Sequence, residues 1–250
     1  MTLLMAGSVS SFPSQRPAAD PYTYSNSSPL SSKHIYPRVA ARVPDQPDHY
    51  LTHPYGMFWE EATASMMVKI DSKGKAVVEG GAWLNDGLQN LCVWIFGSRP
   101  DVNFFVHGHE EEVMAVGSIV DGLLPLNQPA VYLSHITSYI EYNFDEQGDF
   151  PQLFVDTLGD KQILISRNHG YYACGDTAAA AFFRSYFLRQ TCSAQIKTLS
   201  MGRPLHLLDE ALCDQYRLEM SKSEDYNYNG KTEWPGLLRM LDRRDKGYAS

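Results

Sequence analysis

The stretch RPDVNFFVHGH, which runs from Arg99 to His109, decides the fold. Proline cannot donate a backbone hydrogen bond to a helix, so Pro100 predicts a helix end or a tight turn. The apolar run Val102–Val106 is rich in β-branched and aromatic residues and predicts a short strand. Side chains alternate along a strand, so His107 and His109 should point to the same side of it.

A second motif follows about sixty residues later. The apolar run Gln162–Ser166 predicts another strand, and it leads into Asn168-His169-Gly170. If the two strand ends lie side by side, the imidazoles of His107, His109 and His169 converge on one point. Three neutral histidines with an open fourth position are typical of a catalytic metal site. The alternative is that these are ordinary surface or core histidines at strand ends.

Taken together, the R-P-D-V, H-x-H and N-H-G motifs resemble those of the class II aldolase and adducin head family. The resemblance covers about Val43 to Leu208. It implies that His107, His109 and His169 bind one divalent ion. It also implies an α/β fold, a three-layer αβα sandwich whose mixed, mostly antiparallel sheet lies between helical layers. Family members commonly form tetramers with sites at subunit interfaces, so we expect a homotetramer or another homo-oligomer.

Composition limits the function further. The chain has 250 residues, 44% of them hydrophobic and 20% charged, which are ordinary values for a globular protein. A net charge of −8 without any basic run argues against nucleic acid as a partner. We expect no membrane partner, because no stretch is apolar for long enough to span a bilayer. The four cysteines are widely spaced and predict free thiols in the cytoplasm: Cys92, Cys174, Cys192 and Cys213.

These patterns predict that the chain divides into three parts. Residues 1–42 are predicted to be a disordered or atypical tail, because serine, proline and small residues dominate their first part. Residues 43–213 form the aldolase-like domain, and residues 214–250 a loop and docking segment. Within the domain the spacing of apolar residues predicts helices over 82–97, 150–159 and 176–199 and short strands over 123–126 and 130–133, with Gly170 and Gly175 marking a turn.

Four further side chains are considered for proton transfer. Glu110 and Glu111 follow the H-x-H motif, where they would begin a helix or act as a base beside the metal. His135 and Tyr139 lie in a segment crowded with tyrosines, which is either a plain strand surface or the wall of a pocket. The predicted catalytic residues are therefore His135, Glu110 and Tyr139.

The chain also departs from the family pattern. The resemblance places a glutamate, a metal ligand or general base, eleven residues before the arginine of R-P-D, but this position holds Leu88. The loop that helps to hold a substrate phosphate has no counterpart in Tyr36–Arg42. A sugar phosphate is therefore disfavoured as the substrate. Loss of the glutamate is similar to the branch of decarboxylating oxygenases of aminocoumarin biosynthesis, which are thought to use non-haem iron.

Three functions remain open. The first is a metal-dependent lyase, of aldolase or decarboxylase type, that acts on a small oxygenated carbonyl or carboxylate compound of secondary metabolism, with Zn²⁺ as the expected ion. The second is an oxygenase with Fe²⁺ on the same three histidines, since affinity alone does not select the metal. The third is a non-catalytic, adducin-like interaction module.

Overall fold

The computed structural model describes residues 35–36, 38–58, 64–77, 84, 86–143, 148–223 and 227–244. Most of the predicted tail, residues 1–42, lies outside these ranges, whereas its residues 38–42 belong to a strand. The chain divides into two compact units. The first takes in the chain up to Phe104 and again from Thr232, and the second runs from Phe105 to Lys231.

The described strands of the first unit follow the hydrogen-bonding order β3-β2-β1, and those of the second follow the order β4-β7-β6-β5 in the sheet. β1 and β2, β2 and β3, and β6 and β7 pair antiparallel, whereas β5 and β6 pair parallel. The sheet is therefore mixed and mostly antiparallel, and the predicted α/β class is confirmed.

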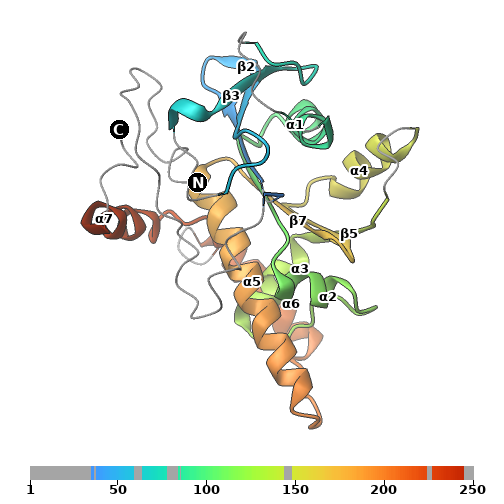
Figure 1. Ribbon diagram of the computed structural model, residues 1–250. Coiled ribbons are helices and arrows are strands. Elements are labelled where there is room, and N and C mark those ends of the chain that lie inside the picture. The colour runs from blue at the N-terminus through green and yellow to red at the C-terminus, as the bar shows by residue number, and fades with distance from the viewer. Residues whose placement is uncertain are drawn as a thin grey trace. The chain divides into compact units, whose positions relative to one another are not determined.

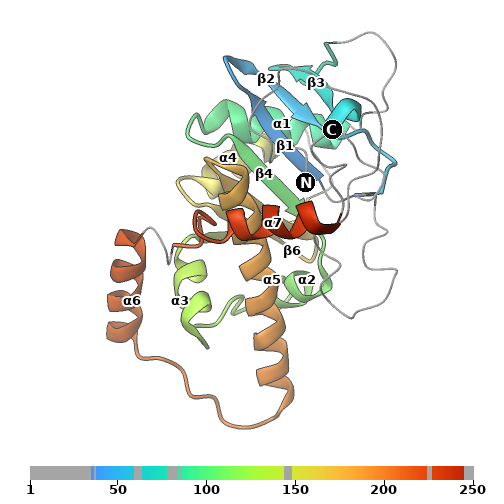
Figure 2. The same ribbon diagram turned by 90° about the vertical axis from the view of Figure 1, so that its left-hand side faces the viewer.

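The described residues of the first unit include the strands and helices that lie before β4 and after α6 in the chain (Figures 1 and 2). Its elements are β1 (Arg38–Val43), β2 (Gln46–Thr52), a 3₁₀ turn η3 (Ala64–Met66), β3 (Val68–Asp71), α1 (Asp86–Ser98) and α7 (Trp234–Arg244). A two-residue loop joins β1 to β2, and Asp45 adopts a positive φ of 61° there. Pro44 and Asp45 are residues that favour such a turn.

The second unit carries the other strands and helices. Its elements are β4 (Phe104–Gly108, with its first residue in the first unit), α2 (Glu111–Gly117), α3 (Gln128–His135), β5 (Thr137–Glu141), α4 (Phe150–Leu158), β6 (Ile163–Arg167), β7 (Gly170–Gly175), α5 (Ala178–Ser200) and α6 (Glu210–Lys222). The long helix α5 packs against α2, α3 and β7, and α6 packs on α3 (Figures 1 and 2).

Helices cover both faces of the sheet in this unit. Ile163 and Ile165 of β6 share one face with Tyr171 of β7, because side chains alternate along a strand. They join a buried core with α2, α3 and α5 that includes Val113, Val116, Leu133, Leu188 and Cys192. On the opposite face Tyr172 meets Phe154 of α4 edge-on, with ring centroids 5.0 Å apart. This arrangement gives the three layers that the resemblance implied.

Several predicted elements differ from the observed ones. Residues 130–133 are helical, in α3, because the Asn127 side chain accepts a hydrogen bond from the Ala130 N–H and Pro129 stands in the first turn. Gly170–Gly175 is not a turn but the fully buried strand β7. The predicted domain boundaries also fall inside elements, because β1 begins at Arg38 and α6 spans residues 210–222.

The helices predicted at 150–159 and 176–199 are confirmed as α4 and α5. The helix predicted at 82–97 corresponds to α1, although part of its expected start lies outside the described residues. None of the helices in the described ranges has the length and apolar character that a bilayer crossing would need.

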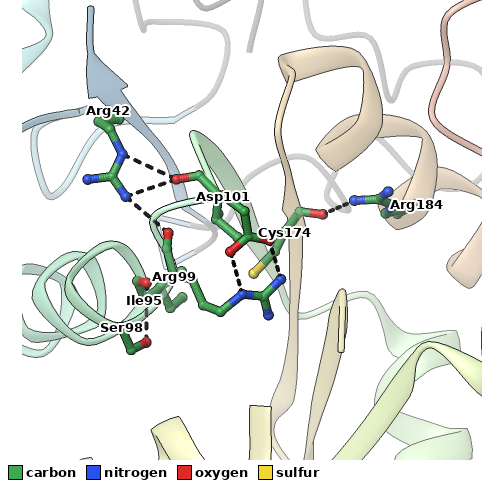
Figure 3. Close-up of polar contacts among 8 residues, drawn as sticks. Arg42, Ile95, Ser98, Arg99, Asp101, Cys174 and Arg184 are labelled. Atoms are coloured by element: carbon green, nitrogen blue, oxygen red, sulfur yellow. Dashed lines mark hydrogen bonds and ion pairs between the residues drawn. The ribbon is translucent and has the colours of Figure 1, made fainter. Parts of the chain in front are cut away.

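The R-P-D stretch is the turn that ends α1, as predicted. The helix stops at Ser98, and the Val102 N–H donates to the Arg99 carbonyl oxygen over 3.0 Å. The Arg99 guanidinium also pairs with the Asp101 carboxylate, with Nη2 and Oδ2 2.7 Å apart (Figure 3). The turn therefore carries the chain from the end of α1 towards β4.

Arg42 of β1 fixes this turn through the backbone (Figure 3). Its Nη2 donates to the carbonyl oxygens of Phe96, Arg99 and Val102 at 2.9, 3.1 and 3.1 Å, and Nη1 donates to that of Pro47 at 2.7 Å. The last carbonyls of a helix have no partner within the helix, so a cationic side chain that donates hydrogen bonds to them stabilises the helix end.

Replacement of Arg42 should therefore destabilise the fold. Arg42→Met keeps the aliphatic length but leaves the carbonyls without their donor, and we expect the free energy of unfolding to fall by about 2–4 kcal/mol. Urea unfolding followed by circular dichroism measures this loss. Arg217→Met is the control, because it removes an ion pair with Asp214, whose side chain is 67% exposed, and it should change stability by less than about 1 kcal/mol. Equal losses in the two variants would contradict the role of Arg42.

Candidate metal centre

His107 and His109 lie at the end of β4 and point to the same side, as the alternation of side chains predicts. The Nδ1 atom of His107 lies 2.8 Å from the carbonyl oxygen of Tyr171 on β7. A carbonyl can only accept, so Nδ1 carries the proton and the Nε2 atom keeps a lone pair. This contact fixes the imidazole in the tautomer that a metal ligand requires.

The third histidine is presented by the hairpin between β6 and β7. The His169 N–H donates to the Ser166 carbonyl oxygen over 3.1 Å, which closes a turn around Arg167 and Asn168. Asn168 has a φ of 60°. A positive φ at this position is typical of a type II turn and favours glycine or asparagine. The asparagine of the N-H-G motif therefore shapes the turn that carries His169.

The three imidazoles converge. One ring nitrogen from each of His107, His109 and His169 lies within 4.8 Å of the others, and the Nε2 atoms of His109 and His169 are 3.1 Å apart. Nitrogen ligands around a tetrahedral Zn²⁺ are separated by about 3.4 Å. Burial lowers the pKa of His169, which favours the neutral form that binds metals. The donor set therefore fits one divalent ion.

Two aromatic rings border the triad. The ring of Tyr172 stacks on that of His107, with centroids 4.5 Å apart, and the ring of Tyr142 stacks on that of His169 at 4.2 Å. Tyr142 follows β5 directly and is 36% exposed. The position of Tyr142 beside His169 depends on the parallel pairing of β5 with β6, which brings the two strand ends together and leaves no local pattern in the sequence.

Glycines at two positions allow the strands to approach. A Cβ atom at Gly170 would lie 2.4 Å from the carbonyl oxygen of Gly108 and 2.5 Å from Cδ2 of His109. A Cβ atom at Gly108 would lie 2.3 Å from Oε2 of Glu110 and 2.5 Å from the hydroxyl oxygen of Tyr171. Both glycines are therefore needed for close packing around the triad.

Glu110 occupies a different place from the one expected of a base beside the metal. Its carboxylate fills the space where a side chain at position 108 would be, and on a strand this direction is opposite to that of His107 and His109. The Oε2 atom is shielded from solvent and has no hydrogen-bond partner in the described part of the chain. Burial raises the pKa of Glu110, and a hydrogen bond from the Tyr171 hydroxyl opposes the shift.

The structure does not bring His135 or Tyr139 to the triad of the same chain. His135 ends α3, is exposed, and precedes β5. β5 runs parallel to β6, so His135 lies at the end of these strands opposite to the hairpin that carries His169. Tyr139 is paired with Ile165 on the α2 face, and its hydroxyl accepts a hydrogen bond from the Leu123 N–H at 2.9 Å.

Glu111 and Glu112 form the first turn of α2, as the helix-start interpretation predicted. Glu111 is exposed, and Glu112 pairs with Arg189 of α5, with Oε2 and Nε 3.3 Å apart. Leu88, which stands where the resemblance places a glutamate, belongs to α1, but its side chain is not among the described ones.

A family model described as "Class II Aldolase and Adducin N-terminal domain" matches residues 32–196. The chain belongs to this family. Most of the second unit and the strands of the first lie within the match. Both metal-site motifs also lie inside it, so the family assignment includes the residues that form the triad.

Relatives in the class II aldolase and adducin family include proteins described as aldolase class 2 proteins and adducins. An aldolase class 2-type protein of Caulobacter vibrioides is 34% identical over 221 residues, which cover 86% of this chain and 84% of that protein. Alpha-adducin of Rattus norvegicus is 33% identical over 230 residues, 84% of this chain but only 30% of adducin. This chain therefore corresponds to less than a third of an adducin.

Solved structures agree with this assignment. An aldolase II superfamily protein from Pseudomonas syringae matches with a TM-score of 0.80 and 27% identity over 88% of both chains. L-fuculose 1-phosphate aldolase from Glaciozyma antarctica matches with a TM-score of 0.71 and 17% identity, over 85% of this chain and 84% of that chain. The second match supports the fold alone.

The close approach at Gly170 generates a first prediction for the site. Gly170→Ala should displace the His109 imidazole and weaken Zn²⁺ binding by about 10-fold or more, as loss of a metal's supporting contacts commonly does. Isothermal titration with Zn²⁺ measures the change. Gly97→Ala is the control, because its added Cβ meets no atom within 4 Å, and its affinity should match the wild type. Unchanged affinity in Gly170→Ala would refute the packing argument.

The buried Glu110 carboxyl generates a second prediction. Because its folded-state pKa lies above the ordinary value of 4.5, burial of the ionised form reduces the stability of the metal-free protein as the pH rises above that value. We expect Glu110→Gln to be more stable than the wild type at pH 7 in the presence of a chelator, and the difference to vanish below about pH 4. Thermal melts across this range test the expectation, with the exposed Glu111→Gln as the control. A wild type that is more stable than Glu110→Gln at pH 7 would show that the ionised carboxylate is satisfied.

Proposed function

We propose that this chain is a divalent-metal-dependent lyase that acts on a small hydroxy-carbonyl or carboxylated compound. The observation that carries the proposal is the convergence of His107, His109 and His169, with ring nitrogens within 4.8 Å of one another. Membership of the class II aldolase and adducin family supports it. Zn²⁺ is the proposed ion, with Fe²⁺ as the alternative on the same ligands.

The chemistry follows from the donor set. A divalent ion on three neutral imidazoles keeps its charge and open positions, so it supplies Lewis acidity towards a carbonyl or carboxylate oxygen. The Tyr171 carbonyl holds His107 in place through Nδ1. The half-exposed Tyr142 ring lies over His169 and borders the position that a substrate would take. We therefore propose Tyr142, rather than Tyr139 or His135, as the tyrosine that contacts substrate.

The substrate class rests on what the sequence lacks. Leu88 stands where the resemblance places the glutamate of sugar-phosphate aldolases, and a leucine can neither bind a cation nor take a proton. The phosphate-holding loop has no counterpart either. These departures favour a compound without phosphate. The proposed reaction, retro-aldol cleavage or decarboxylation, rests on the family and not on these departures.

Similarity to adducin favours a second candidate, a non-catalytic interaction module. The intact triad argues against it, because three histidine ring nitrogens within 4.8 Å of one another are typical of a metal site. We further propose that the chain acts in the cytoplasm as a homotetramer or another homo-oligomer, without a nucleic-acid or membrane partner. The net charge of −8 supports the expectation of no nucleic-acid partner, and four buried cysteines that form no disulfide support the cytoplasm.

The first test is the metal content of untagged protein purified anaerobically without chelator. We expect about one divalent ion per chain, loss of that ion in His169→Ala, and retention in His206→Ala, whose histidine is exposed in the segment between α5 and α6. A panel of hydroxy-carbonyl and carboxylated compounds is then tested for aldehyde or CO₂ release.

The outcomes separate the candidates. Product release that needs the metal but not dioxygen supports the lyase. Iron in the purified protein together with oxygen uptake would replace it by the oxygenase. A metal-free wild type whose stability is unaffected by added Zn²⁺ would favour the adducin-like module.

A further inference from the structure

Arg167 is the last residue of β6, two residues before His169. Along β6 it alternates with Ser166 and shares the face of Ile165, which is the face covered by α2. Its guanidinium lies over the ring of Tyr139, with the central carbon 4.7 Å from the ring centroid. The side chain is mostly buried, at 22% exposure, so its position is restricted by packing.

The guanidinium binds the end of α2. Nη1 donates to the carbonyl oxygens of Gly117 and Ile119 at 3.3 and 2.8 Å, and Nη2 donates to that of Val120 at 3.2 Å. Gly117 is the last residue of α2, and the other two belong to the turn that follows it. Carbonyls at a helix C-terminus have no partner inside the helix and carry partial negative charge. A buried arginine supplies both the hydrogen-bond donors and the positive charge that they need.

The other end of α2 meets the metal site. The helix begins at Glu111, two residues after His109. Seven residues of α-helix span only about 10 Å and do not bend easily. The helix also lies directly on β6, since a Cβ atom at Gly117 would be 3.0 Å from Cγ2 of Ile165. One short helix therefore connects the strand end that carries His109 to the strand end that carries His169.

We propose that Arg167 is a positioning residue, which holds the His169 hairpin at its distance from His107 and His109 by clamping the C-terminal carbonyls of α2. This inference rests on the proposed metal site. The ion pair between Arg167 and Glu141, with Nε and Oε1 3.6 Å apart, is not part of the clamp, because the Glu141 side chain is 83% exposed and such pairs contribute little.

Cobalt binding tests the clamp without any assay of activity. Co²⁺ is titrated into apo-protein of the wild type, Arg167→Met and Arg167→Lys, and both Kd and the d–d absorption of the saturated protein are recorded well below each melting temperature. We expect the Kd of Arg167→Met to rise by about 10- to 100-fold, with an altered spectrum because the histidines no longer hold one geometry. Arg167→Lys, which keeps a cation near the helix end, should lie between the two.

Lys161→Met is the matched control. Lys161 precedes β6 and donates from Nζ to the carbonyl oxygen of His135 at the end of α3, at 2.9 Å. It therefore also places a cation on a helix C-terminal carbonyl, but at the end of β6 away from His169. Its removal should leave both the Kd and the cobalt spectrum at wild-type values, even if the melting temperature falls.

Each result decides between the proposals. A wild type that binds Co²⁺, with Arg167→Met unchanged in Kd and spectrum, overturns the clamp and leaves the metal site standing. A wild type that binds no Co²⁺ overturns both. If Arg167→Met fails to fold, Arg167→Lys decides: wild-type Kd and spectrum overturn the clamp, and weaker binding with an altered spectrum supports it.

Discussion

The hydrogen bond between Nδ1 of His107 and the carbonyl oxygen of Tyr171 is the contact on which the site depends. It joins two neighbouring strands through a side chain, and at the same time it selects the tautomer of a candidate metal ligand. The carbonyl belongs to a strand that is buried along its whole length, so its position is set by the core of the second unit. The orientation of His107 therefore follows from the packing of the sheet.

Around this contact the chain keeps the two faces of the sheet chemically distinct. The face towards α2, α3 and α5 holds the apolar core and the Glu110–Tyr171 pair, in which the Tyr171 hydroxyl also lies 2.5 Å from that of Ser185. The histidines project from the strand ends on the other side of β4. Glycine at position 108 makes this division possible, because the absent side chain leaves room for a buried carboxyl one strand thickness away from the three imidazoles.

The convergence of the three histidines could be predicted from the sequence because each motif is local. H-x-H needs only strand alternation, and N-H-G needs only a tight turn. The fold class came from the family resemblance together with apolar runs of the right length. The features that could not be predicted from the sequence depend on residues far apart in the chain. In the sequence β7 is a short run with a glycine at each end, which resembles a turn. It forms a strand because it pairs with β4 and β6 on its two sides. α3 is short, and its β-branched and aromatic residues predicted a strand. The asparagine cap at its start stabilises the helix instead. Glu110, His135 and Tyr139 were placed by nearness in sequence, whereas pleat direction and the parallel β5–β6 pairing decide where they point.

The division of the sheet into two faces has a consequence for the history of such a fold. The residues that give the second unit its core are not the residues that would hold an ion, apart from the shared backbone of β4, β6 and β7. Exchange of the three imidazoles for other side chains would leave the apolar layer intact. Few substitutions would thus be enough for a related protein to lose metal binding and keep the fold. The same fold could then serve in protein interaction with little repacking of the core.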